Sequence, residues 1–253
     1  MFNRLMAVAG VAIAATFLTP AAPASAGLLG PASCADIKAS NPAATDGAYS
    51  ILAGGLGGLI GGLGQLLPVY CTDMAGEPKA YLSLPNTGPG HNYSQYLAGG
   101  ASRGTTVVTS YSAIRFDPVP VSYFPLTFRA NIADQTFSRS TGQLCHSSGP
   151  PCPGNVVTSM PYGVAFDCIS PGSSAGRANI DLTGTPFYVV DTFVVRSFRG
   201  SGKATFNSPQ NVDLAGGGYC GWIAPADIYN PSNDSPKNDA NGGWDLRLTL
   251  LGL

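Results

Sequence analysis

The fold is decided by Val69-Tyr70-Cys71-Thr72-Asp73-Met74 and its continuation Lys79-Ala80-Tyr81-Leu82-Ser83-Leu84. Apolar and aromatic residues recur on both sides of a break that contains glycine and proline, which is typical of two strands joined by a turn. Cys71 lies inside the first apolar run, where a cysteine suits a disulfide to an earlier segment. The nearest earlier cysteine is Cys34. The stretch therefore predicts a β-hairpin that is tied by a disulfide to the chain before it.

Residues 1–26 have the pattern of a secretory signal peptide. Arg4 supplies the charge, Leu5 to Leu18 form an apolar run of 14 residues, and Ala24-Ser25-Ala26 is a small-x-small cleavage site. A transmembrane anchor is the alternative, but a membrane span needs about 20 apolar residues. We therefore expect a secreted, extracellular protein whose mature chain, residues 27–253, forms a single domain.

Composition narrows the class of protein. Loss of the leader removes Arg4 and takes the formal net charge from −1 to −2, which gives no electrostatic reason to expect nucleic acid as a partner. Only 11% of residues are charged, while the chain holds 33 glycines and 21 prolines. This balance is typical of turn-rich β structure and argues against a helical protein.

All six cysteines follow the predicted cleavage site. An even number of cysteines in an exported chain predicts three disulfides, although spacing alone allows 15 connectivities. We predict the pairs that are sequential and that each close a loop containing a turn: Cys34–Cys71, Cys145–Cys152 and Cys168–Cys220.

The pattern of the remaining chain predicts an all-β fold, a disulfide-stapled β-sandwich or an irregular β domain. One short helical turn is expected over Cys34–Ser40, with Ser33 as its N-cap. In the last strand the predicted core-facing residues are Trp244, Leu246, Leu248 and Leu250, and the predicted water-facing residues are Asp245, Arg247 and Thr249. The other predicted strands are Ala48–Leu52, Thr105–Ser112, Ala113–Phe116, Val119–Phe128 (edge or bent, since it contains prolines), Tyr162–Cys168, Ala178–Leu182, Phe187–Phe198, Asn211–Leu214 and Trp244–Leu250.

A Gly/Leu-rich segment at 53–67 has two interpretations. Its leucines and isoleucine suit a hydrophobic finger that contacts a membrane or a partner. Its seven glycines oppose a stable helix, at up to about 1 kcal/mol each relative to alanine. We favour a flexible insertion between two strands over membrane contact.

The search for catalytic motifs finds none that is complete. The two histidines, His91 and His146, form no His-Glu-x-x-His motif, and we interpret both as exposed loop residues without a metal. Gly172-Ser173-Ser174-Ala175-Gly176 matches a serine hydrolase elbow, but a strand follows it and no histidine lies further along the chain. Gly200-Ser201-Gly202-Lys203 resembles a phosphate loop without its Ser or Thr, so we expect a hairpin turn. No catalytic residue, metal ligand or cofactor is therefore predicted.

Other polar features are also weak indicators of a site. Asn238-Asp239-Ala240-Asn241-Gly242 lacks the alternating ligands of a calcium loop, so a solvated loop is expected. The sequons beginning at Asn92 and Asn233 predict surface turns.

Several motifs in order resemble the GON domain. They begin with Cys34, Asp46-Gly47-x-Tyr49, Val69–Met74 and Tyr81-Leu82-x-Leu84, and they continue with Asn92-Tyr93-Ser94, Thr109, Ile114-Arg115, Asp167-Cys168, Asn179–Phe187 and Tyr219-Cys220-Gly221. The resemblance covers about 33–222, with the insertion at 53–67 and the C-terminal extension 223–253 as departures from the family pattern.

The GON domain is found in stand-alone bacterial proteins and at the C-terminus of some ADAMTS secreted metalloproteinases. In those proteins proteolysis belongs to a separate zinc domain, so a metallopeptidase label would not describe this chain. The opening motifs are also similar to the start of fibrinogen C-terminal domains, where the two cysteines are bonded, and this supports Cys34–Cys71.

Two functional hypotheses follow. The first is a secreted GON-like binding module for an extracellular protein or carbohydrate. The second is a secreted hydrolase or metallopeptidase-related protein, which requires that carboxylates such as Asp73, Asp167 and Asp181 converge in a deep pocket.

Overall fold

The computed structural model describes residues 30–54, 65–123, 125–146, 156–196, 199–225 and 245–251. The predicted leader 1–26, most of the Gly/Leu-rich segment and the solvated loop predicted at 238–242 lie outside these ranges. Cys152 and the sequon at Asn233 also lie outside them. No helix among the described residues is long and apolar enough to cross a membrane.

The hairpin predicted from the opening stretch is present. Strands β2 (Gln65–Thr72) and β3 (Lys79–Ser83) pair in antiparallel fashion, with Tyr70 opposite Tyr81. The turn between them begins at Asp73, whose Oδ2 atom accepts a hydrogen bond from the backbone N–H of Glu77 (3.2 Å). Met74 is buried beside it, and its N–H donates to Asp46 Oδ1 (2.8 Å). Asp73 is therefore a turn-forming residue and Met74 a core residue.

Helix α1 (Cys34–Ser40) confirms the predicted helical turn. Its N-cap is Ser33, whose side chain accepts from the N–H of Asp36, and this satisfies one of the amides that a helix start leaves unpaired. The disulfide between Cys34 and Cys71 joins the helix to β2, and both cysteines are buried. Helix and hairpin therefore form one unit, as the sequence predicted.

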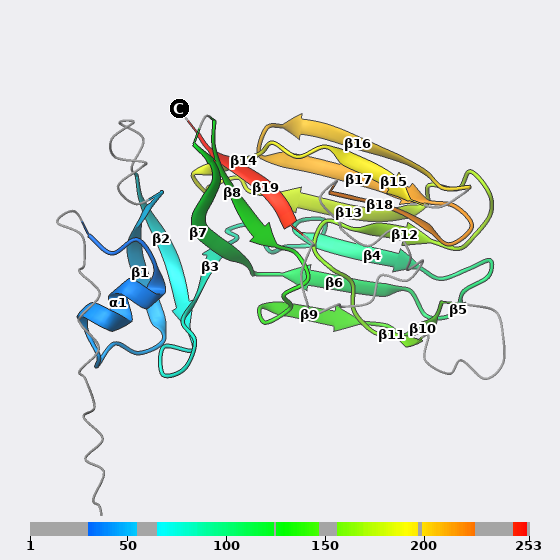
Figure 1. The fold of residues 1–253 in the computed structure, drawn as a ribbon. Coiled ribbons are helices and arrows are strands. Elements are labelled where there is room, and N and C mark those ends of the chain that lie inside the picture. Colours follow the sequence, from blue (N-terminus) through cyan, green and yellow to red (C-terminus); the bar gives the residue numbers. More distant parts are fainter. Residues whose placement is uncertain are drawn as a thin grey trace, which may run out of the picture.

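Seven strands form the first sheet, called sheet A here, in the order β1-β2-β3-β7-β8-β19-β14. All of its pairings are antiparallel, and the sheet curls around the left half of the molecule in Figure 1. Besides β2 and β3, its strands are β1 (Gly47–Ala53), β7 (Ala113–Tyr123), β8 (Leu126–Asn131), β19 (Asp245–Leu250) and β14 (Phe187–Val189).

The second large sheet, sheet B, lies beside sheet A and contains nine strands (Figure 1). The path runs β15-β18-β12-β4-β13-β17-β16, with β6 paired to β4 and β9 paired to β6. Among the strand pairings of the described residues, β12–β4 alone is parallel. These strands are β4 (Tyr93–Leu97), β6 (Val107–Tyr111), β9 (Ser138–Thr141), β12 (Ala165–Asp167), β13 (Gly176–Asp181), β15 (Phe193–Arg196), β16 (Ser201–Ser208), β17 (Asn211–Gly217) and β18 (Gly221–Pro225).

A small third sheet joins β5 (Arg103–Gly104), β10 (Leu144–Cys145) and β11 (Val156–Val157). Two aromatic groups fill the interior of the large sheets. Phe116, Phe128 and Phe187 contact one another under sheet A, with ring centroids 5.1–5.8 Å apart. Tyr96 packs on Phe166 under sheet B, at 4.0 Å. The all-β class with one short helix is therefore confirmed.

Two predicted strands are each divided in the structure. The stretch 119–128 is not one edge or bent strand, because its first part belongs to β7 and its last part to β8. Pro125 lies between the two strands. Proline has no backbone N–H to donate, and at this position no strand hydrogen bond is lost. The stretch 187–198 divides into β14 of sheet A and β15 of sheet B. Both stretches are mostly apolar, so their sequences do not indicate where one strand ends and the next begins.

Three smaller predictions were wrong. Thr249 is buried and not exposed to water, because its hydroxyl donates to the carbonyl of Leu126 (2.5 Å). Lys203 lies within β16, which starts at Ser201, and not in a hairpin turn. Asn92 is fully buried, so the sequon there marks an internal asparagine and not a surface turn.

Candidate functional site

Asp167, one of the carboxylates named in the hydrolase hypothesis, serves to hold the surrounding backbone in place. Its side chain is fully buried and accepts five hydrogen bonds of 2.9–3.3 Å. Four donors are backbone N–H groups and the fifth is the hydroxyl of Ser173. Ser173 directly precedes Ser174, the serine of the elbow-like motif, and strand β13 (Gly176–Asp181) follows that motif, as predicted.

Asp181 has a different environment, because it contacts a histidine. The Nδ1 atom of His91 lies 2.7 Å from Asp181 Oδ2, and the same oxygen accepts from Asn86 Nδ2 (3.0 Å). Burial by itself would raise the pKa of Asp181, but hydrogen bonds from Thr183, His91 and Asn86 outweigh it and hold the pKa below its ordinary value of 3.8. Asp181 is therefore an ionised carboxylate that orients an imidazole.

Buried Asn92 fixes this arrangement. Its Oδ1 accepts from the hydroxyl of Tyr162 (2.5 Å) and from the N–H of Asp181 (2.8 Å), while its Nδ2 donates to the carbonyls of Asn86 and Asp181. Its positive φ of 47° is tolerated better by asparagine than by most residues. The loop that carries His91 is thereby attached to β13.

His91 faces an open cleft. Its side chain is 46% exposed, against 2% for Asp181, and the cleft has a volume of about 480 Å³. Burial, followed by the charge of Asp213, raises the pKa of Tyr93, which lines the cleft. The other lining residues are Thr87, Gly88, Pro89, Gly90, Val108 and Ser110. A histidine whose Nδ1 is held by a carboxylate presents Nε2 as a base or a ligand. His91 is exposed as predicted, but no residue near it in the sequence indicates that Asp181 is its partner.

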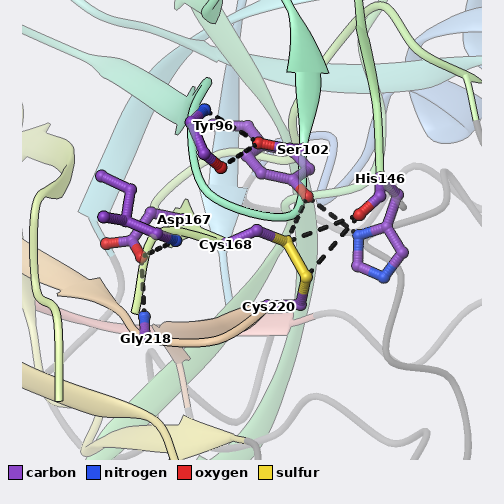
Figure 2. The surroundings of a disulfide bond; sticks show 9 residues. Tyr96, Ser102, His146, Asp167, Cys168, Gly218 and Cys220 are labelled. Atoms are coloured by element: carbon purple, nitrogen blue, oxygen red, sulfur yellow. Dashed lines mark hydrogen bonds between the residues drawn. A yellow bond between two sulfur atoms is a disulfide. The ribbon is translucent and has the colours of Figure 1, made fainter. Parts of the chain in front are cut away.

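The second histidine lies against a disulfide (Figure 2). Cys168 and Cys220 are bonded, as predicted, and His146 reaches them from the end of β10. Its Nδ1 atom is 2.9 Å from the hydroxyl of Tyr96, which is also 2.9 Å from Cys168 Sγ. The prediction of an exposed loop histidine is therefore wrong for His146, which is half-buried among Tyr96, Phe166 and the disulfide. Its predicted neighbour pair, Cys145–Cys152, cannot be described because Cys152 lies outside the described residues.

The third feature is a charged cleft of about 480 Å³ between α1 and sheet A, called the sheet A cleft. Arg129 lies 3.4 Å from both Asp117 and Asp245, and Arg115 lies 3.9 Å from Asp134. Polar and charged side chains from β3, β7, β8 and β19 therefore line one concavity. Its lining residues are Ser33, Cys34, Ala35, Pro78, Lys79, Ala80, Arg115, Phe116, Asp117, Pro118, Arg129, Asn131 and Asp245.

The three carboxylates of the hydrolase hypothesis thus each have their own partners. Asp73 closes a turn, Asp167 accepts five hydrogen bonds, and Asp181 contacts His91. Within the described ranges, one set of three His, Cys, Asp or Glu side chains lies close enough to share a metal ion, and it is His146 with Cys168 and Cys220. The sequence could not reveal the pairing of His91 or the surroundings of His146, since their partners lie 20 to 90 residues away.

Comparison with known families identifies one match: residues 31–113 match the family model described as the GON domain. The resemblance is confirmed for this part, which is about a third of the chain and contains the Cys34–Cys71 disulfide, the opening hairpin and His91. Asp181, His146 and the second disulfide lie beyond the matched range. No curated protein and no solved structure matches the chain.

Proposed function

We propose that this protein is a secreted extracellular binding module, and that the sheet A cleft binds a polar ligand on an extracellular protein or carbohydrate. Three features support this proposal. Residues 31–113 match the GON domain, the first 26 residues have a signal-peptide pattern, and disulfides persist mainly in proteins of oxidising compartments.

The arrangement of charges in the cleft is the observation that carries the proposal. Lys79, Arg115 and Arg129 bring cationic donors to the same concavity as the carboxylates of Asp117 and Asp245. Planar guanidinium groups match carboxylates and sulfates, and carboxylates accept from hydroxyls, so both protein and sugar ligands find partners here. Its volume of about 480 Å³ falls in the range of about 300–1,000 Å³ that is usual for ligand pockets.

The ion pairs of the sheet A cleft contribute little to the free energy of unfolding. Arg129 is 44% exposed and Asp117 is 39% exposed. Exposed pairs of this kind contribute about 0–1 kcal/mol. Substitutions in the cleft should therefore alter binding more than folding, which makes the proposal testable with folded variants.

The test is a glycan array together with a pull-down of extracellular proteins, both with the oxidised mature protein. Arg115→Gln and Lys79→Gln remove cleft charges, and Lys203→Gln, exposed on β16, is the matched control. We expect each cleft variant to lose about tenfold in affinity, which corresponds to about 1.4 kcal/mol, and the control to bind as wild type does. Equal binding by all four proteins would place the ligand elsewhere and overturn the assignment of the cleft.

A second candidate function is a secreted hydrolase that uses a histidine base in place of the converging carboxylates first expected, and one observation favours it. The Asp181-oriented imidazole of His91 lines the same cleft as the hydroxyl of Ser110. Histidine held in this way is the general base of many acyl-transfer enzymes. The metallopeptidase alternative has less support, because the two cysteines in the one metal-capable set of the described chain are joined in a disulfide.

Activated esters and peptide libraries test the hydrolase candidate. Turnover that falls at least about 100-fold in His91→Gln, and that persists in His146→Gln, would support it, because a positioned base contributes about 10²–10⁴-fold. Turnover that is absent, or equal in both variants, would exclude His91 as a catalytic base.

A further inference from the structure

The cluster around the second disulfide brings three metal-binding side chains together from separate segments. His146 follows β10, Cys168 follows β12, and Cys220 precedes β18. One ligand atom from each residue lies within 4.8 Å of the others. Figure 2 shows the imidazole of His146 beside the two bonded sulfur atoms.

The donor set and the spacing suit a soft metal ion. Zinc prefers cysteine and histidine in tetrahedral geometry, with bonds of about 2.3 Å to sulfur and about 2.0 Å to nitrogen. These bond lengths place the ligand atoms about 3.5–3.8 Å apart. The three atoms already lie within 4.8 Å of one another, so the sulfur atoms must separate from each other and the imidazole nitrogen must come within about 3.5 Å of each sulfur.

The two cysteines are held together by more than their disulfide. Asp167 Oδ1 accepts from the N–H of Ile169, next to Cys168, and from the N–H of Gly218, two residues before Cys220. Asp167 also pairs with Gly221 in the β12–β18 ladder. Because the backbone around both cysteines is anchored in this way, their side chains should remain neighbours after the S–S bond is broken.

Two polar groups lie where they can bond to Cys168 and Cys220 once the disulfide is reduced. The carbonyl oxygen of His146 lies 3.5 Å from Cys168 Sγ and 3.6 Å from Cys220 Sγ. A disulfide sulfur carries no proton, so these contacts become S–H···O hydrogen bonds only when the cysteines are thiols. The Tyr96 hydroxyl lies 2.9 Å from both His146 Nδ1 and Cys168 Sγ, where it can orient either ligand.

We infer that reduction of the Cys168–Cys220 disulfide converts this cluster into a binding site for a zinc-class metal ion, with His146, Cys168 and Cys220 as ligands. Two equivalents of an external thiol supply two electrons and two protons and are oxidised to their own disulfide, while Cys168 and Cys220 become thiols. Metal binding then releases the two thiol protons, because thiolates are the ligands. Reoxidation of the cysteines would expel the ion. The inference does not depend on the proposed binding function.

The other described disulfide provides an internal comparison. Cys34 and Cys71 are also buried and bonded, but no histidine or carboxylate completes a three-ligand set with them within the described residues. Reduction of that pair should give thiols without the same affinity for metal.

The test uses cobalt(II) as a spectroscopic probe for the mature protein, first oxidised and then reduced with a phosphine. We expect the oxidised protein to be silent, and the reduced protein to bind one ion with a thiolate-to-cobalt charge-transfer band and the visible bands of tetrahedral coordination. His146→Gln retains both cysteines and should weaken binding by at least about 10–100-fold, the cost of losing even an outer partner of a metal site.

Two further variants complete the experiment. Cys34→Ser with Cys71→Ser should leave the signal unchanged, and Cys168→Ser with Cys220→Ser should abolish it. The inference is overturned if the reduced wild type gives no charge-transfer band. It is equally overturned if His146→Gln binds as tightly as wild type, since the ion would then be held by other cysteines.

Discussion

His91 Nδ1 lies 2.7 Å from Asp181 Oδ2, although 90 residues separate the two in the sequence. The exposed imidazole is held by a carboxylate that is 2% exposed. The pairing depends on β13 lying beside β4, with Ala178 opposite Ser94. Asp181 thereby holds the imidazole of His91 in place at the edge of a cleft. The same contact makes the stability of the protein depend on the ionisation of Asp181, and so on pH.

Asp181→Asn should therefore change how stability depends on pH. The folded-state pKa of Asp181 is below 3.8, so the ionised side chain contributes stability above that pH, and the contribution is lost as the pH falls through the folded-state value. Urea unfolding should show the variant less stable by about 1–3 kcal/mol at neutral pH, with a smaller difference from wild type near pH 3. Glu77→Gln, on an exposed turn, is the control. A difference that does not shrink in acid would contradict this account.

Asn92→Gly should be severely destabilising. Glycine accepts the positive φ of 47° but removes both acceptor bonds and both donor bonds of the amide. Buried groups left unpaired cost about 1–3 kcal/mol each, so we expect a loss of about 3 kcal/mol or more.

Asn41→Gly provides the comparison for that experiment, since Asn41 is exposed at the end of α1. The substitution removes one exposed hydrogen bond, from the N–H of Ala43 to Asn41 Oδ1 (3.2 Å), so its cost should be no more than about 1 kcal/mol. Denaturant unfolding of both variants measures the difference. Similar losses in the two variants would show that the Asn92 network does not hold the loop.

Local patterns explain what could be predicted from the sequence. The hairpin around Cys71 was visible because its strands and turn lie within 16 residues, and α1 was visible from the N-cap Ser33. The strand–turn–strand pattern and the N-cap each depend on residues that are close in the sequence, and both are present in the structure. The pairing of Cys34 with Cys71 was also predicted, because the hairpin needed a nearby earlier cysteine.

Features set by tertiary contacts could not be predicted in this way. The apolar run from Phe187 gives no sign that β14 pairs with β19 while β15 pairs with β18 in the other sheet. Asn92 has the local sequence of a surface sequon, and only the position of β13 shows that it is buried. The surroundings of His146 likewise depend on three segments that meet only in the folded protein.

The Cys34–Cys71 disulfide should contribute strongly to stability. It closes a separation of 37 residues, for which the loss of unfolded-state entropy predicts about 3–4 kcal/mol. Cys34→Ser with Cys71→Ser should lower the free energy of unfolding by that amount, and non-reducing peptide mapping of the wild type should recover this pair, Cys168–Cys220 and the predicted Cys145–Cys152. A mixed pairing in the map would contradict the assigned connectivity.

Gly217→Ala tests how Asp167 supports the second disulfide. A Cβ atom at position 217 would lie 2.0 Å from Asp167 Oδ2, and the φ of +148° is unfavourable for alanine. The carboxylate would have to move, which weakens its bonds to Ile169 and Gly218 on either side of the disulfide. We expect a loss of about 2–4 kcal/mol, well above the usual cost of a strained alanine, because a buried hydrogen-bond network is disturbed as well.

Gly217→Ala should also change the rate at which Cys168–Cys220 is reduced, without changing that of Cys34–Cys71. With Asp167 displaced, Cys168–Cys220 should be reduced faster by a small thiol, measured by mass spectrometry of alkylated peptides, while Cys34–Cys71 keeps its wild-type rate. Gly88→Ala is the control, because position 88 has a negative φ and no atom within 4 Å of the added Cβ. If Gly217→Ala left the reduction of Cys168–Cys220 unchanged, Asp167 would not be the anchor that keeps the two cysteines together.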